Sequence, residues 1–319
     1  FLELTKYLSW GGLFFLVVNN VRTKRDVAVL ANGIIWFGVA ISIFAIIQHF
    51  SYSGKVYWFD PDGSAITPVG PFVMKNNFAG YITMIIPLAM GYILTEMPLS
   101  RRVVYATGVV LMSIAMFLSL SRGGVLVYGL TACVFIAVCL RRPVVRQKSA
   151  FFFLCAVIAV CGLLLFWEGR TIIERLQQLF QQDTFVFWGH GYAWADIVRI
   201  IRDYLFLGSG LGTFSAISSM YKTTYDQDLF TYAHNDIFQL CSEAGLLGCI
   251  IIGWFVWRFL STVLHVWVAR RDSFVVGLGL GCLISILSVI TYALLDFNMH
   301  IFSHILLCAG IFGLTYRLM

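Results

Sequence analysis

The sequence predicts a polytopic, all-α membrane protein, and its composition and hydropathy pattern carry that prediction. Of the 319 residues, 60% are hydrophobic and only 12% are charged, and the mean hydropathy is +0.85. This composition argues against a disordered chain, and a soluble fold of this length has too little interior to hide so much apolar surface. The apolar runs are continuous and do not alternate with polar residues, which favours helices over a β-barrel.

A helix needs about 20 mostly apolar residues to cross a bilayer. We expect about nine such spans here and about twelve in a complete protein, because the chain begins at Phe1 and is expected to be a piece of a longer one. The spans cover roughly residues 4–21, 27–50, 78–95, 103–120, 124–140, 150–167, 237–260, 273–294 and 303–317. The predicted organisation is therefore transmembrane helices over 1–167, a loop domain over 168–236 and C-terminal transmembrane helices over 237–319.

Basic residues cluster on alternate connections between these spans, so they share one side of the membrane. The members are Arg22, Lys24, Arg25, Arg101, Arg102, Arg141, Arg142, Arg146, Lys148, Arg258, Arg270, Arg271 and Arg317. The positive-inside rule predicts that this side is cytoplasmic. Phe1 then lies outside, and an odd number of preceding spans would restore a cytoplasmic N-terminus.

The outer side is expected to carry the active surface, because its long loop over 168–236 holds the densest group of ionisable residues. Part of this loop has the spacing of an amphipathic helix near the outer interface, with Arg199 and Arg202 away from its apolar face. The apolar positions are Trp194, Ile197, Ile200, Ile201 and Leu205. The outer side has no ATP, so group transfer there requires an activated donor.

Two residues are the candidates for chemistry. Arg122 lies in the segment Ser-Leu-Ser-Arg-Gly-Gly at the outer boundary, where a guanidinium suits a phosphate or pyrophosphate; the alternative is an arginine that reaches lipid phosphates. His234 precedes Asn235 and Asp236, and a neutral histidine there suits a general base; the alternative is an interfacial loop residue. Asn235 and Asp236 either orient the histidine or cap the next helix.

Four further features are weaker. Lys75, at the start of a span with Asn76 and Asn77, either holds a phosphate or lies at the interface. The glycine-rich turn over 208–214 is expected to pack closely on spans and not to bind a nucleotide. Asp296, His300 and His304 recur every four residues, where capping, polar packing or lining of the site is favoured over a metal. The eight cysteines are expected to be helix-packing residues and not disulfides.

Together these segments resemble the O-antigen ligase superfamily, which includes the Wzy-type O-antigen polymerases. The segments are NNFAGY at 76–81, SLSRGG at 119–124, RDYLFLGSGLGTF at 202–214, AHNDIFQLCSEAGLLG at 233–248 and ALLDFNMHI at 293–301. They occur in the expected order from about residue 70 to the end.

The resemblance implies an inverting glycosyltransferase of the bacterial inner membrane that needs no metal or other cofactor. It would take a glycan from an undecaprenyl-pyrophosphate donor and pass it, on the periplasmic face, to lipid A core, another glycan or a protein. The resemblance assigns Arg122 to the donor pyrophosphate and His234 to the acceptor hydroxyl. Lys75, Asn77, Arg199, Arg202, Asn235, Asp236 and His300 are expected to bind substrate.

The sequence departs from the family pattern at two places. A second family arginine usually lies four residues before a tryptophan, and His190 occupies that position before Trp194. Either His190 replaces it in part, or Arg170, Arg175, Arg199 or Arg202 supplies the second cation. The usual proline before the glycine turn is replaced by Leu205.

Two other function classes remain open at this point. One is a transporter or flippase for a lipid-linked glycan, which should have polar groups near the membrane midplane. The other is an assembly subunit without chemistry of its own. Partners common to these classes are the lipid bilayer and a lipid-linked glycan, and nothing in the sequence suggests nucleic acid.

Overall fold

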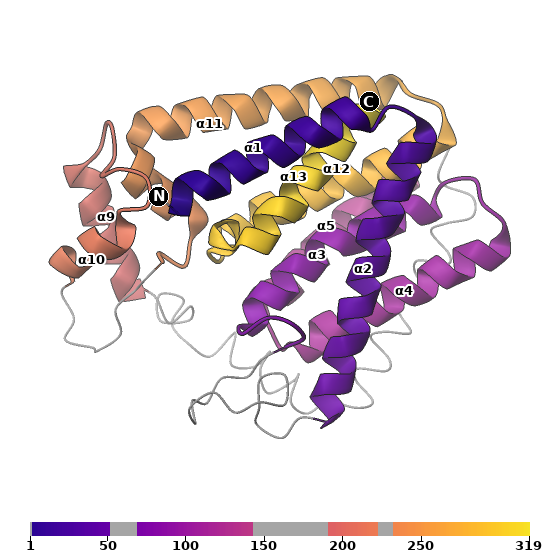
Figure 1. Ribbon diagram of the computed structural model, residues 1–319, viewed down its shortest axis with the longest axis horizontal. Helices are drawn as coiled ribbons and strands as arrows, with labels where there is room; N and C mark the ends of the chain where they lie inside the picture. The colour runs from indigo at the N-terminus through magenta and orange to yellow at the C-terminus, as the bar shows by residue number, and fades with distance from the viewer. Residues whose placement is uncertain (1, 52–68, 143–190, 223–231) are drawn as a thin grey trace.

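The computed structural model describes residues 2–51, 69–142, 191–222 and 232–319, and that part of the chain is helical (Figure 1). Its helices are α1 (Leu2–Asn20), α2 (Lys24–Ser51), α3 (Lys75–Ile93), α4 (Leu99–Leu118), α5 (Arg122–Arg141), α9 (Gly191–Asp203), α10 (Phe214–Tyr221), α11 (Asp236–Ala269), α12 (Ser273–Ala293) and α13 (Phe302–Leu318). A 3₁₀ turn, Asn298–His300, separates the last two.

Each expected span coincides with one of these helices, except 150–167, which lies outside the described residues. The helices α2, α4, α5, α11 and α12 are long and apolar enough to cross a membrane, and α13 is a shorter apolar helix. The all-helical fold is therefore confirmed for the described residues, and it fits a helical membrane protein. The count of nine spans stays a prediction, as does the division of the chain into three regions.

The core forms where α3 crosses α12. A Cβ on Gly91 would lie 2.5 Å from the carbonyl oxygen of Gly277, and one on Gly281 would lie 2.6 Å from that of Pro87. The two backbones therefore approach more closely than any side chain allows. Close approach at small residues is the usual basis of helix association in a membrane, where no hydrophobic effect drives helices together.

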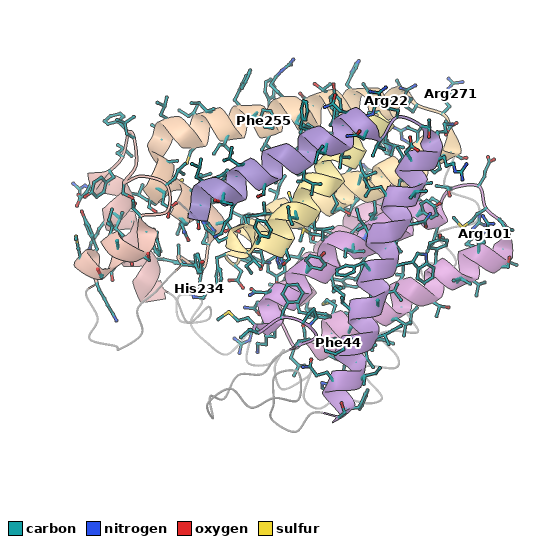
Figure 2. The ribbon with its side chains drawn as sticks, viewed as in Figure 1. Arg22, Phe44, Arg101, His234, Phe255 and Arg271 are labelled. Carbon is teal, nitrogen blue, oxygen red and sulfur yellow. The ribbon has the colours of Figure 1, made fainter. Side chains whose placement is uncertain are left out.

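The other helices surround this pair. The helices α2, α4 and α5 pack against α3, α5 also packs against α12, and α1 runs along α13 (Figure 1). Helix α11 differs, because its apolar side chains are largely exposed, including Ile250, Trp254, Phe255 and Trp257 (Figure 2). A helix with an exposed apolar surface of this kind is suited to face lipid.

The described basic residues of these connections gather at one end of the bundle, as their alternation in the sequence predicts, except Arg258, which lies within α11 and not on a connection. Figure 2 shows Arg22, Arg101 and Arg271 at the end opposite His234. Near them Lys24 Nζ lies 2.6 Å from the Asp272 carboxylate, so the starts of α2 and α12 are linked. We refer to this as the basic end, and to the end with His234 as the outer end. Which end faces the cytoplasm stays a prediction.

Candidate functional site

The Ser-Arg-Gly-Gly turn joins three helices at the outer end. Ser121 caps α5, since its Oγ accepts a hydrogen bond from Gly124 N at 3.2 Å. The same hydroxyl donates to Asn76 Oδ1 at 2.9 Å and lies 3.2 Å from the Tyr292 hydroxyl. Tyr292 in turn donates to the Asn76 carbonyl at 2.9 Å. Segments far apart in the sequence are thereby held together by buried hydrogen bonds.

This arrangement places two cations at neighbouring helix starts. Arg122 is the first residue of α5 and Lys75 the first residue of α3, and both are half-buried. Because Ser121 bonds Asn76, these two N-termini are close together. Helix N-termini present backbone N–H groups and a partial positive charge. Two cations added to two such ends make this region attractive to a polyanion.

His234 lies against Asp296. Its Nδ1 is 3.5 Å from Asp296 Oδ1, and its ring packs edge-on against Phe297 with centroids 4.8 Å apart. The histidine side chain is 23% exposed, whereas that of Asp296 is only 5% exposed. A buried carboxylate behind a partly exposed imidazole is the arrangement that orients a histidine toward a ligand.

Asp236 and His300 form a second pair beside it. Asp236 Oδ1 is 2.7 Å from His300 Nδ1, and Oδ2 accepts from Met299 N at 2.9 Å. Asn235 caps α11, because its Oδ1 accepts from two backbone N–H groups, while its Nδ2 donates to the Leu294 carbonyl at 2.9 Å. Asn235 and Asp236 therefore attach the start of α11 to the connection after α12. Of the two interpretations that the sequence left open, this agrees with the one in which these residues cap the next helix. A substrate-binding role for either residue, and for His300, stays a prediction.

The Ser121 and His234 regions are connected through one short segment. Tyr292 and Asp296 lie one turn apart, with Asp296 N bonded to the Tyr292 carbonyl at 3.0 Å.

Two non-glycine residues in the described part of the chain have a positive φ, Leu120 at 52° and His234 at 49°. Such conformations are strained and concentrate at functional sites. Both occur in the two segments expected to carry the chemistry.

Asp296, His300 and His304 do not share one helical face, so their four-residue spacing does not bring the three side chains together. Helix α12 ends at Ala293, and the chain turns before α13 begins at Phe302. The three side chains consequently meet different partners. Asp296 faces His234, His300 bonds Asp236, and His304 Nε2 lies 2.9 Å from the Asn77 carbonyl. Among the three favoured interpretations, polar packing describes the contacts of His300 and His304.

The glycine-rich turn packs on α11, as expected. Glu243 is buried, and its carboxylate accepts from Gly212 N at 2.8 Å and Phe214 N at 3.2 Å. Gly208 has φ 70°, and a Cβ there would lie 2.2 Å from the Glu243 carbonyl oxygen. Gly208 is therefore required for the close approach of this turn to the backbone of α11 and for the local backbone conformation.

Helix α9 is amphipathic, as the spacing predicts. Ile197 and Ile200 are buried, and Trp194 packs edge-on against Phe238 of α11 with centroids 5.6 Å apart. Arg199 lies 3.5 Å from Asp196 and is mostly exposed.

Arg202 is also exposed, so neither arginine of α9 belongs to the buried network around His234. His190 lies outside the described residues, as do Arg170 and Arg175. The second cation of the site therefore remains a prediction.

Helix α1 contributes residues that the sequence analysis did not select. Lys6 is buried, its Nζ is 2.6 Å from Glu3 Oε1, and it lies 5.9 Å from the ring centroid of Tyr232. Tyr232 stacks on Phe297 at 4.8 Å, beside His234. A charged pair inside an apolar stretch was the available signal, since intramembrane charges are rare without a function or a partner.

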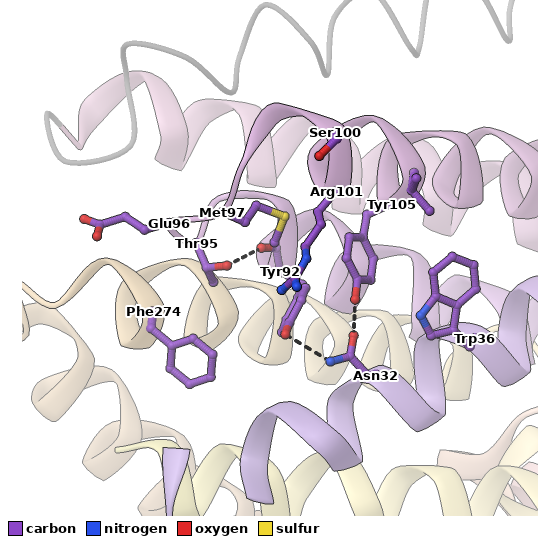
Figure 3. A pocket seen from close by; sticks show the side chains of 11 residues that line it. Asn32, Trp36, Tyr92, Thr95, Glu96, Met97, Ser100, Arg101, Tyr105 and Phe274 are labelled. Carbon is purple, nitrogen blue, oxygen red and sulfur yellow. Dashed lines mark hydrogen bonds between the residues drawn. The ribbon is translucent and has the colours of Figure 1, made fainter. Parts of the chain in front are cut away.

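A cavity of about 570 Å³ lies away from these residues (Figure 3). It is lined by side chains that include Asn32, Tyr92, Arg101, Tyr105 and Phe274. Asn32 bonds the hydroxyls of both tyrosines. Since Arg101 marks the basic end, this cavity is not part of the outer site.

Comparison with known proteins gives one result that bears on function. A family model described as O-Antigen ligase matches residues 107–253, a range that includes Arg122 and His234. Comparison with curated proteins finds no match.

Proposed function

Residues 107–253 carry the O-antigen ligase domain and identify the chain as a member of the O-antigen ligase superfamily, and from that premise we propose a specific transfer reaction. The family supports ligase- or polymerase-type function in a bacterial membrane. We propose that this chain transfers a glycan from an undecaprenyl-pyrophosphate donor to an acceptor hydroxyl at the outer end, on the periplasmic face. The observation that carries the proposal is the convergence of the Arg122 and His234 segments on 292–296.

In the proposed reaction, His234 takes the proton of the acceptor hydroxyl as its oxygen attacks the anomeric carbon. The bond from that carbon to the pyrophosphate oxygen breaks, with inversion, and lipid pyrophosphate leaves. Asp296 lies 3.5 Å from His234 Nδ1 and favours the tautomer with hydrogen on that nitrogen, which makes Nε2 the basic atom. Asp296 also stabilises the imidazolium that forms when the proton arrives.

Arg122 and Lys75 meet the charge that develops on the leaving pyrophosphate. Fixed cations and helix N-termini stabilise such charge without reorganising during the reaction. A bidentate contact from arginine to phosphate is worth about 1.5–3 kcal/mol. This part of the site supports a metal-independent mechanism, in which side chains supply the positive charge. The lipid tail of the donor would lie between the helices, with its head group beside Arg122.

Four of the described spans, α3, α4, α5 and α12, give little support for a carrier. Helix α12 contains no Asp, Glu, Lys, Arg or His, and in α3, α4 and α5 residues of these five types lie within a few residues of the helix ends. An alternating-access carrier needs polar groups near the midplane. A silent assembly subunit is separated from an enzyme by the assay that follows.

The test is a reconstituted transfer assay with the full-length protein, polyprenyl-pyrophosphate glycan and three acceptors, namely lipid A core, a second lipid-linked glycan and a protein. Chelator is included in parallel samples. We expect transfer that survives the chelator and is lost in Arg122→Ala and His234→Ala. The acceptor used distinguishes ligase from polymerase. Donor binding without transfer to any acceptor would contradict the proposal, and full activity in both variants would overturn the site.

A further inference from the structure

Helix α11 is broken at Gly245, close to its outer end. Gly245 has φ 62° and ψ −172°, values outside the helical region. The break divides the helix into an outer arm, 236–244, and a long apolar part that begins at Leu246. The arm carries Asp236 and Glu243, so its placement positions both the His300 pair and the glycine-rich turn.

The segment 205–210 takes over the hydrogen bonds that the break interrupts. Ser209 N and Gly210 N donate to the carbonyls of Ser242 and Glu243, both at 2.9 Å. On the other side of the break, Leu246 N donates to the Leu205 carbonyl at 2.8 Å. Backbone groups at membrane depth must be paired, so the bent conformation is built into the fold and is not a frayed end.

The bend brings two thiols together. Cys241 precedes the break and Cys249 follows it, and their sulfur atoms are 3.1 Å apart. In a regular helix, residues eight apart are separated by about 12 Å along the axis. Both cysteines are half-buried. A disulfide requires a sulfur–sulfur distance of about 2.05 Å, so closure needs a movement of about 1 Å.

We propose that Cys241 and Cys249 form a disulfide that fixes the bend of α11. This differs from the sequence-based expectation that the cysteines only fill space between helices. The pair lies at the same end as His234, which the proposed orientation places on the oxidising side of the membrane, where disulfides persist. The inference concerns this bond and does not depend on the glycan transfer reaction.

The oxidant is a protein disulfide of the thiol–disulfide oxidoreductase class. One of the two thiolates attacks a sulfur of that disulfide, forms a mixed disulfide and expels one thiolate of the oxidant. The second cysteine thiolate then attacks the first cysteine sulfur and expels the other thiolate. The cysteine pair loses two electrons and two protons, and the oxidant is reduced to its dithiol.

The test isolates the full-length protein from bacterial membranes in the presence of an alkylating agent, followed by digestion without reductant and mass spectrometry. We expect linked peptides containing Cys241 and Cys249, lighter by two hydrogen atoms than the two thiols. In Cys241→Ser, Cys249 should be alkylated without prior reduction. The matched control Cys133→Ser, an exposed cysteine on α5, should leave the link intact.

A second readout measures what the bond does. On reduction, we expect faster hydrogen exchange at the amides that bridge the break, those of Ser209, Gly210 and Leu246, with no change at the α3–α12 crossing. Full alkylation of both thiols in wild-type protein, even after incubation with oxidised glutathione, would overturn the proposal. A link found together with unchanged exchange after reduction would overturn the claim that it fixes the bend.

Discussion

Two side-chain contacts, each involving an aspartate, have nearly equal lengths but differ in their burial and in their place in the molecule. At the outer end, Asp236 and His300 are 2.7 Å apart and their side chains are only 6% and 9% exposed. At the basic end, Lys24 and Asp272 are 2.6 Å apart with exposures of 66% and 44%. An exposed pair contributes about 0–1 kcal/mol and costs little to keep. A buried polar pair is costly to desolvate, and apolar replacement is often neutral for stability. The burial of the two pairs, and not their contact distance, therefore separates the candidate site from the basic end.

The largest effect is expected from a histidine substitution at each end. His234→Ala should lower the transfer rate by about 10²–10⁴-fold, because the acceptor hydroxyl loses its base. His265→Ala, on the exposed surface of α11 away from the outer end, should leave the rate unchanged. Rates in reconstituted vesicles at equal protein content provide the measurement. Equal losses in the two variants would mean that the ends do not differ in function.

Arginine substitutions give the next effect. Arg122→Ala should lower kcat/KM for the donor by about 10–100-fold, because fixed charge at the leaving pyrophosphate is lost. Arg101→Ala removes the same charge at the basic end and serves as the control. Arg122→Lys should recover part of the rate, since it keeps the charge without the bidentate fork. If Arg101→Ala were as slow as Arg122→Ala, the loss of rate would come from the change in net charge and not from the position of Arg122.

A matched pair of Asp→Asn changes measures the difference in stability. Asp236→Asn should destabilise the fold by about 3 kcal/mol, because His300 and Met299 N lose a buried carboxylate. Asp272→Asn should cost less than about 1 kcal/mol, because Lys24 remains solvated and asparagine still caps α12. Thermal unfolding in detergent gives both values. The reverse order would contradict the role assigned to burial.

The smallest effect is a pH dependence at the basic end. The hydrogen bond from Lys24, followed by that from Val275 N, lowers the pKa of Asp272 below its ordinary value of 3.8. A lowered pKa in the folded state stabilises the fold above the ordinary value, and that contribution is lost as the pH falls through the lowered one. The difference in melting temperature between wild type and Asp272→Asn should therefore shrink below about pH 4. A difference that grows on acidification would contradict the assignment.

The sequence alone was sufficient to predict most of the helices, because a long apolar run has few stable conformations other than a helix in a membrane. Helix α11 is the exception, since the apolar run predicted 237–260 and the helix runs to Ala269. Its break at Gly245 was not predicted, because glycine is frequent in membrane helices. The bent backbone is stable only through the partners supplied by 205–210, which lie outside the helix itself.

The candidate site was predictable only in part. Arg122 and His234 stood out because each lies at a polar boundary of an apolar chain. Asp296 was noted with two histidines, yet its contact with His234 depends on a turn that ends α12 before it. Tyr292, Ser121 and Lys6 have no local signal of comparable strength. Their place in the site depends on tertiary packing, which periodicity does not reveal.

The most direct test of the account is a double-mutant cycle on the His234–Asp296 pair. Single-turnover transfer is measured with saturating lipid-linked donor for wild type, His234→Ala, Asp296→Asn and the double variant, with donor binding measured in the same vesicles. If Asp296 acts through His234, the double variant should be no slower than His234→Ala alone, and donor binding should persist in all four. Losses that multiply would contradict the account, as would a His234→Ala protein that transfers glycan at the wild-type rate.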